Sequence, residues 1–184
     1  MALEDHLRTE SGGDGAKLTR LSKRIVFERF LVRLEAVAAG RWLLKGTFAL
    51  DPRLGDRART TVDIDIEWRA DVDEALDALI AAAQRNADEY FIYEIDRTSD
   101  PQDRFGGATR FNVRVELAGR AFERFVLDVG FRSKAAVAAA RVALREDLTF
   151  AGVASAEIGA VHVESQMAEK LHAYSRIFAI PSVA

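Results

Sequence analysis

The sequence predicts an α+β fold, in which a mixed β-sheet is flanked by helices and an N-terminal and a C-terminal helix pack around it. Apolar residues recur with a helical period over residues 17–39 and again over 164–178. Residues 61–68 alternate strictly between apolar and polar side chains, which is the period of a β-strand. Two strand-like runs on either side of Gly119 predict a hairpin, so helices and strands are expected in one unit.

The length of the chain is that of one compact domain. Its 184 residues suffice for a single hydrophobic core, and 49% of them are hydrophobic and 30% charged. A Gly- and Ser-rich run at residues 11–15 predicts a flexible segment over 1–16. The core is expected at 17–163, and a C-terminal helical region, truncated or naturally short, at 164–184.

Composition disfavours several classes of function. The formal net charge of −3 gives no general electrostatic argument for nucleic acid binding. The absence of cysteine excludes disulfides, thiolate catalysis and cysteine-ligated zinc, and no serine lies in a nucleophile-elbow context. His162 and His172 are expected to be surface or core residues. No apolar run approaches the roughly 20 residues that span a bilayer, so a cytoplasmic protein without membrane association is expected.

The elements are predicted in chain order from the period of the apolar residues and from the positions of Gly and Pro. The first helix ends at Gly40. The elements expected after it are a strand that starts at 42 and passes through a turn at Gly46 into a short helix ending before 51, a strand over 61–68, a helix over 73–84, strands over 90–95, 109–117 and 121–129, a helix over 133–145, one or two short strands within 146–163, and a helix over 164–178.

Two aspartates lie at alternate positions of the strand over 61–68. Asp63 and Asp65 leave the strand on the same face, opposite Val62 and Ile64. Two neighbouring carboxylates repel each other unless a cation lies between them, and Mg²⁺ prefers oxygen ligands together with substrate phosphates. The pair therefore indicates a magnesium site, although a solvated strand face carries the same pattern.

The turn upstream strengthens that interpretation. Gly46 lets the backbone approach a phosphate, and the start of the short helix offers free N–H groups and a favourable dipole. Thr47 can add a hydroxyl donor. The alternative is a glycine that serves the turn alone. The order of strand, Gly-Thr, helix and a strand with paired aspartates favours phosphate binding.

Residues 44–50 and 55–65, with Arg59 and Thr61 just before the aspartates, resemble the first motif of the AbiEii/AbiGii-type nucleotidyltransferase toxin family. This family includes the MenT-like toxins and belongs to the polymerase-beta nucleotidyltransferase superfamily. The resemblance implies a nucleotidyltransferase-type sheet and an Mg²⁺-dependent enzyme, with two ions, that transfers a nucleoside monophosphate from an NTP. It also implies the tRNA 3′ acceptor end as substrate and a cognate antitoxin as partner.

Two more positions can be carried over from the family. Asp128, opposite the apolar face of its strand, resembles the third carboxylate, and Lys170 resembles a helical lysine that contacts the triphosphate. The alternatives are an aspartate paired with an arginine and a solvated lysine, and Arg59 could equally pair with an acidic neighbour. The resemblance implies Asp63, Asp65 and Asp128 as metal ligands, Gly46, Thr47, Lys45 and Arg59 as nucleotide contacts, and Asp63, Asp65, Asp128 and Lys170 as the catalytic set.

One sequence motif of the family has no counterpart in this chain. A later segment of the Arg-x-Lys-Asp-x-x-Asp-Leu kind has no counterpart between Arg176 and Ala184. Three explanations stay open: a naturally short member of the family, a truncated chain, and an enzyme with impaired activity. Two other functions stay open as well: transfer to a small molecule or a protein hydroxyl, and a catalytically silent module that binds an antitoxin or RNA. The sequence does not indicate which nucleotide is used.

Overall fold

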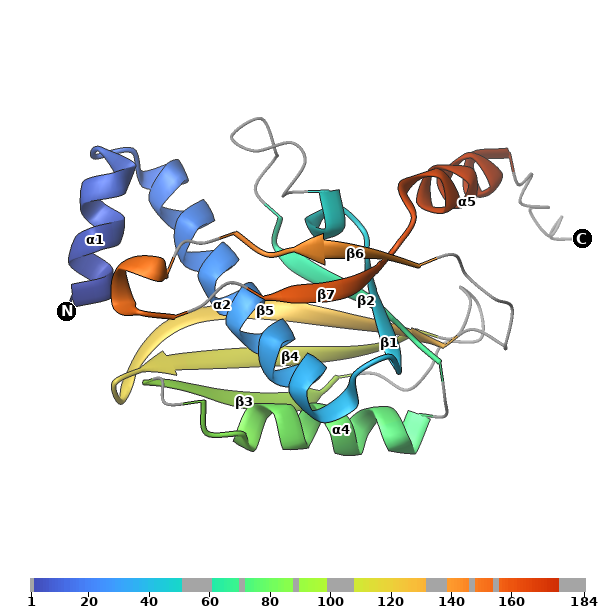
Figure 1. Ribbon diagram of the computed structural model, residues 1–184, viewed down its shortest axis with the longest axis horizontal. Helices are drawn as coiled ribbons and strands as arrows, with labels where there is room; N and C mark the ends of the chain where they lie inside the picture. Colours follow the sequence, from blue (N-terminus) through green and yellow to red (C-terminus); the bar gives the residue numbers. More distant parts are fainter. Residues whose placement is uncertain are drawn as a thin grey trace, which may run out of the picture.

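A computed structural model of the chain describes residues 2–50, 61–69, 72–87, 90–98, 108–131, 139–145, 148–153 and 156–175 (Figure 1). Its elements are α1 (Ala2–Ser11), α2 (Gly15–Ala38), β1 (Trp42–Lys45), the 3-10 helix η1 (Phe48–Leu50), β2 (Asp63–Trp68), α4 (Val72–Gln84), β3 (Phe91–Arg97), β4 (Ala108–Leu117), β5 (Arg120–Phe131), β6 (Ala139–Ala143), the 3-10 helix η4 (Thr149–Ala151), β7 (Glu157–Val161) and α5 (Val163–Ser175).

The strands form one seven-stranded mixed sheet in the order β3-β4-β5-β2-β1-β7-β6. β2 runs parallel to β5 and β1 runs parallel to β7, and the other neighbours are antiparallel. The mixed sheet with flanking helices confirms the predicted α+β class. Because β2 and β1 lie at the centre, segments distant in sequence become neighbours there.

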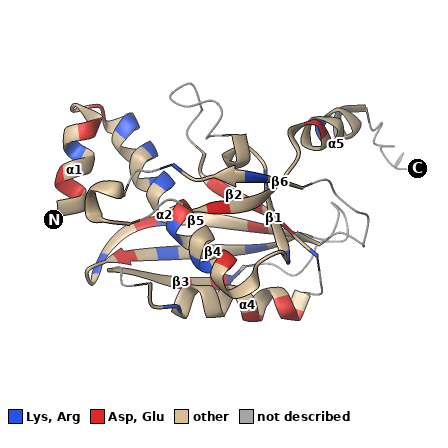
Figure 2. Ribbon diagram, viewed as in Figure 1, with Lys and Arg blue, Asp and Glu red and all other residues tan. Residues whose placement is uncertain are grey.

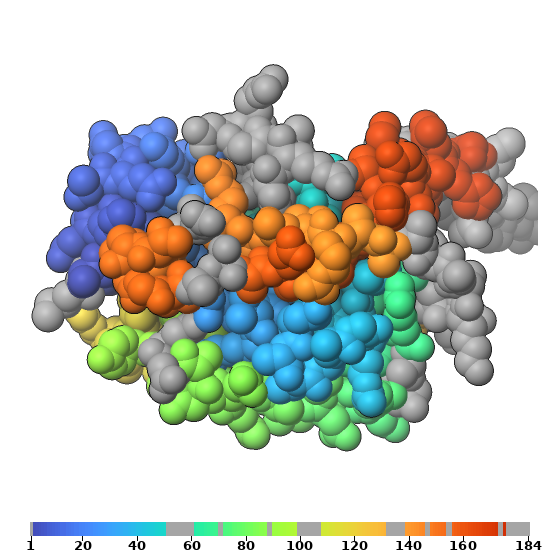
Figure 3. Space-filling model, in the orientation of Figure 1, coloured from blue at the N-terminus to red at the C-terminus, as the bar shows by residue number. Residues whose placement is uncertain are grey.

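The two faces of the sheet differ. Helices α2 and α4 pack against one face, and the core lies between them and side chains such as Ile64, Ile66 and Leu127, which are fully buried (Figure 1). Figure 3 shows α2 beside β6 and β7, with α5 projecting at one end of the molecule. On β3 and β4, every second residue is exposed on the other face. Among the described helices, none is long and apolar enough to cross a membrane.

The N-terminal residues depart from expectation, because 2–11 form helix α1 instead of a flexible segment. Leu7 is only 1% exposed and belongs to the hydrophobic core. Gly12 and Gly13 have positive φ angles, which end α1. Asp14 then caps α2 by accepting two N–H groups of its first turn at 2.8 and 3.0 Å. The Gly-rich run is a tight turn between two helices.

The C-terminal part also corrects one prediction. Of the helix expected over 133–145, residues 139–143 form strand β6, and 132–138 lie outside the described residues. β6 pairs with β7 and buries Val142, so sheet pairing outweighs the helix propensity of the alanines. A strand at β7 was expected within 146–163 and is confirmed.

The β4–β5 hairpin is confirmed, and its register has an irregularity. Ala118 and Gly119 both have positive φ angles, as a two-residue hairpin turn requires. A bulge between Val115 and Glu116 shifts the pairing by one residue. Beyond the bulge, Arg110 pairs opposite Asp128. The bulge thereby decides which side chain of β4 shares a face with that aspartate.

Candidate active site

A row of four charged side chains crosses the centre of the sheet. In register, Lys45 on β1 lies opposite Asp65 on β2, Asp65 lies beside Asp128 on β5, and Asp128 lies opposite Arg110 on β4. Paired residues project from the same face of a sheet, so two aspartates stand between two cations. We call these four residues the charge row. Figure 2 shows acidic positions in red on β2 and basic positions in blue on β4.

Gly46 makes room for the central aspartate. Its φ is +72°, and a Cβ built on it would overlap the carboxylate of Asp65. The glycine turn and the aspartate strand are therefore in direct contact, as the sequence predicted. A side chain here would collide with Asp65, which indicates a role for the glycine beyond the turn.

Lys45, predicted as a nucleotide contact, is partly buried on the sheet face, with 26% side-chain exposure. Its Nζ is 4.0 Å from Oε2 of Glu67, a carboxylate with only 4% side-chain exposure. A Cβ on Gly130 would lie 2.9 Å from the same Nζ, so the lysine reaches over β2 towards β5. Lys45 is thus placed to neutralise neighbouring carboxylates.

The pKa of Asp65 depends on the charged residues around it. Its pKa is raised, chiefly by burial and then by the negative charge of Asp63. Lys45 lowers the pKa, Asp128 raises it and Lys170 lowers it. Lys170 on α5 is therefore close enough to act on this carboxyl. The predicted carboxylates and the helical lysine are brought to one place.

The position of α5 follows from its junction with β7. Only His162 separates β7 from the helix, and β7 runs beside β1, where Leu44 pairs with Ala160. The Gln166 side chain is buried and donates a hydrogen bond to the backbone oxygen of Val161 at 3.0 Å. These contacts hold the first turns of α5 near the end of the charge row. Its apolar residues Met167 and Leu171 face solvent, 60% and 68% exposed.

Asp128 is held by an arginine that sequence reasoning did not identify. Nε and an Nη of Arg110 donate to the two carboxylate oxygens of Asp128, both at 2.8 Å. This is the arginine pairing that the sequence left open for Asp128. The alternation of β4 is the signal that could have found Arg110, but the hairpin bulge hides its register.

The other predicted contacts lie differently. Arg59 falls outside the described residues. Thr47 is partly buried, and its backbone oxygen accepts a hydrogen bond from Leu50 at 3.0 Å in η1. The short helix has only three residues, so its dipole is much weaker than that of a full helix. His162 lies 3.6 Å from Glu164 near the surface.

The donor set suits a hard divalent cation. Asp63, Asp65 and Asp128 offer oxygen ligands alone, and the repulsion that Asp63 and Asp128 exert on Asp65 is the kind that Mg²⁺ relieves. Within the described residues, however, no three acidic or histidine side chains are already arranged to hold an ion. The carboxylate of Asp128 is engaged by Arg110, which would compete with such an ion for it.

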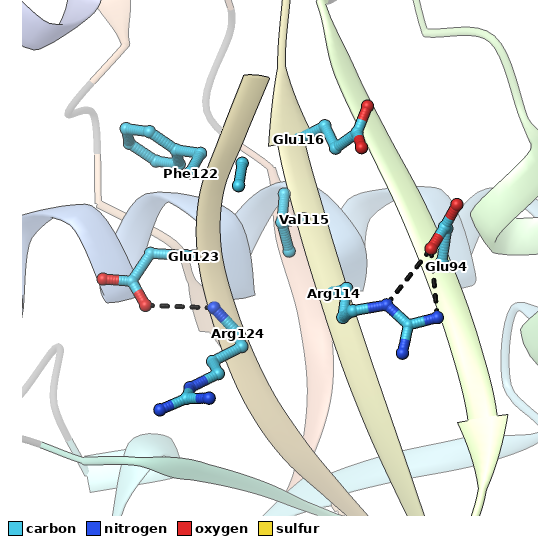
Figure 4. A pocket seen from close by; sticks show the side chains of 8 residues that line it. Glu94, Arg114, Val115, Glu116, Phe122, Glu123 and Arg124 are labelled. Atoms are coloured by element: carbon cyan, nitrogen blue, oxygen red, sulfur yellow. Dashed lines mark hydrogen bonds and ion pairs between the residues drawn. The ribbon is translucent and has the colours of Figure 1, made fainter. Parts of the chain in front are cut away.

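A separate hollow of about 390 Å³ lies on the hairpin, away from the charge row (Figure 4). Glu94, Arg114 and Glu116 are among its lining residues. Figure 4 shows the Arg114 guanidinium turned towards Glu94, to which it donates at 3.2 Å. None of the predicted site residues lines this hollow, so the charge row is the better candidate for chemistry.

Paired aspartates on a central strand, a third on its parallel neighbour, an adjoining glycine turn and a helical lysine define the class of protein: a nucleotidyltransferase fold. The chain belongs to the family described as nucleotidyl transferase AbiEii toxin of type IV toxin–antitoxin systems, whose model matches residues 29–179. The match includes every strand of the sheet and α5. It confirms the resemblance seen in the sequence.

Two crystal structures from Helicobacter pylori match the chain. JHP933 does so with a TM-score of 0.49 and 19% identity, over 81% of this chain and 56% of that one. A protein described as a candidate nucleotidyltransferase gives 0.48 and 18%, over 81% and 58%. The chain therefore spans a little over half the length of these proteins. No curated protein matches it in sequence.

Proposed function

We propose that the chain carries the active site of an Mg²⁺-dependent nucleotidyltransferase, which transfers a nucleoside monophosphate from an NTP to an acceptor hydroxyl. One observation carries the proposal. Asp65 lies beside Asp128 and against Gly46, and it lies within electrostatic reach of Lys170. These residues come from four separate segments, and a sheet has no structural need to gather like charges at its centre.

Asp63, Asp65 and Asp128 would hold the metal. When bound, Mg²⁺ stabilises charge on the attacking and leaving oxygens of an in-line displacement. The acceptor oxygen bonds to the α-phosphorus, the bond to the β-phosphate breaks, and pyrophosphate leaves. The hydroxyl proton passes to a carboxylate, for which Asp128 is our candidate.

The two lysines have different roles in this proposal. Lys170 is exposed on α5 and would bind the triphosphate. Lys45 is partly buried, with its Nζ near Glu67, so it would offset the negative charge of the carboxylates from its place on the sheet face. Gly46 would keep Asp65 in place, and Thr47 and Arg59 would add contacts to the nucleotide.

For the acceptor we propose the 3′ end of tRNA, with a cognate antitoxin as partner and the cytoplasm as location. The family is one of toxins in toxin–antitoxin systems, which supports a macromolecular target and an antitoxin. A nucleotide added to the acceptor end would block aminoacylation and arrest growth. Small-molecule or protein hydroxyls are the competing acceptors.

A second candidate function is a catalytically silent binding module. It is favoured by Arg110, which occupies both oxygens of Asp128, and by the lack of a ready three-residue metal cluster among the described residues. The two candidates differ in a measurable way, because only the enzyme binds an NTP with Mg²⁺ and turns it over.

The first prediction tests transfer directly. The protein is incubated with Mg²⁺, each labelled NTP in turn and purified tRNA, and Asp65→Asn is compared with the unaltered chain. The substitution keeps the shape of the side chain but removes the metal-binding charge, so transfer should fall by at least roughly a hundredfold. Asp77→Asn, on the exposed side of α4, is the matched control and should retain full transfer.

Other outcomes would each change the assignment. Label that still reaches tRNA in Asp65→Asn would reject the site. Label on small hydroxyl compounds or on the protein itself, but never on tRNA, would replace the acceptor. If the unaltered protein binds no nonhydrolysable NTP analogue in the presence of Mg²⁺, the silent module is the correct function.

A further inference from the structure

Arg110 forms the most specific charge contact of the site. Its guanidinium meets the Asp128 carboxylate in parallel, with two hydrogen bonds of 2.8 Å. The two residues face each other across neighbouring strands, so the backbone register presents them to each other. A fork of this kind engages both carboxylate oxygens, so Arg110 competes with a metal ion for Asp128.

Arg110 belongs electrostatically to the whole carboxylate group. Its pKa is raised, first by the hydrogen bond to Asp128 and then by the charges of Asp128, Asp63 and Asp65. Its side chain is 57% exposed, whereas that of Asp128 is 20% exposed. Arg110 is therefore the more solvent-exposed member of the pair, and Asp128 is the more buried one.

The neighbouring Arg114 shows what an ordinary surface pair on this strand looks like. It lies on the same face of β4, is 60% exposed, and pairs with Glu94 and Asp96 of β3 at 3.1 and 2.7 Å. Those carboxylates lie outside the charge row. The two arginines have similar exposure and both are paired, but only Arg110 is paired with a predicted metal ligand.

We propose that Arg110 is a further substrate-binding residue, which holds Asp128 while the site is free of metal and moves to a phosphate of the nucleotide when metal takes that carboxylate. This rests on the proposed function. The guanidinium fork fits a phosphate as well as a carboxylate. Arg110 thus offsets the negative charge of the carboxylates before metal binds, and the negative charge of the triphosphate afterwards.

The proposal requires opposite effects on two ligands. In Arg110→Ala, Mn²⁺ alone should bind more tightly, by roughly two- to fivefold, because its competitor for Asp128 is gone. A nonhydrolysable NTP analogue at saturating Mg²⁺ should bind more weakly, by roughly tenfold, because a bidentate phosphate contact is lost. Both affinities are measured by titration calorimetry, without turnover. Arg114→Ala is the matched control and should change neither.

The outcomes separate the possibilities. Weaker binding of both ligands by Arg110→Ala would show that the arginine merely positions Asp128 and would overturn the proposal. Unchanged binding of either ligand would overturn it as well. If the unaltered protein binds no analogue at all, the proposed function itself fails, and this inference falls with it. Tighter Mn²⁺ binding together with weaker nucleotide binding supports the proposal.

Discussion

Gly46 and Gly40 have nearly the same backbone conformation but different surroundings. Their φ angles are +72° and +73°, yet only at Gly46 would a Cβ meet a side chain, the carboxylate of Asp65. Alanine at either position should cost about 1–2 kcal/mol of stability through the left-handed backbone. Gly46→Ala should cost about 1–3 kcal/mol more through the clash, and should weaken Mn²⁺ binding because Asp65 is displaced.

Urea unfolding and Mn²⁺ titration of the two variants measure this difference. Gly40→Ala controls for the backbone, since nothing lies within 4 Å of its Cβ. Equal Mn²⁺ affinities in Gly46→Ala and Gly40→Ala would show that Gly46 serves the turn alone, the alternative that the sequence left open.

At the scale of elements, the sequence indicated which segments are strands more reliably than how they pair. The alternation over 61–68 correctly predicted that Asp63 and Asp65 share a face. Counting outward from the hairpin turn would place Arg110 opposite Leu127, with its side chain on the wrong face. The bulge at Val115 and Glu116 adds one residue to β5 and brings Asp128 into that place. No residue type in the hairpin marks the bulge.

Helix α1 was missed for a related reason, and it carries a stability prediction. A short polar helix before a Gly-rich turn resembles a flexible lead-in, but Leu7 is buried in the core at 1% exposure. Leu7→Ala should lower the free energy of unfolding by about 2–4 kcal/mol, because it leaves a cavity under α1. Arg8→Ala, on the exposed side of the same helix, should change it by less than about 0.5 kcal/mol. Chemical denaturation measures both, and equal stabilities would contradict the docking of α1.

At the scale of the whole molecule, the site is a product of strand order. Lys45, Asp65, Arg110 and Asp128 become one row only because β4, β5, β2 and β1 are consecutive in the sheet. The family resemblance supplied Asp128 and Lys170, which spacing alone could not have connected to Asp65. The partly buried position of Lys45 depends on Gly130, more than 80 residues away in the chain by their numbering. Such partners are fixed by the fold and not by any local pattern.

A functional site made of repelling carboxylates should reduce the stability of the whole domain. The folded-state pKa of Asp65 is raised above its ordinary value of 3.8, so the folded protein holds this proton more tightly than the unfolded chain. The stabilisation that comes from this tightly held proton is complete below pH 3.8 and is lost as pH rises through the raised pKa. At neutral pH the ionised carboxylate therefore destabilises the fold, and Asp65→Asn should melt at a higher temperature than the unaltered protein. The difference should shrink as pH falls through that window.

Magnesium should remove the same repulsion. At a concentration about one hundred times its Kd, Mg²⁺ should stabilise the unaltered protein by about 2.7 kcal/mol, but should leave Asp65→Asn nearly unchanged. Thermal unfolding by circular dichroism, with and without Mg²⁺ and at several pH values, measures both effects in the same two proteins. A lower melting temperature for Asp65→Asn at neutral pH, or an equal response of both proteins to Mg²⁺, would show that Asp65 is a structural carboxylate. We expect the variant to be more stable and insensitive to Mg²⁺. That result would mean that Asp65 serves metal binding at the expense of stability.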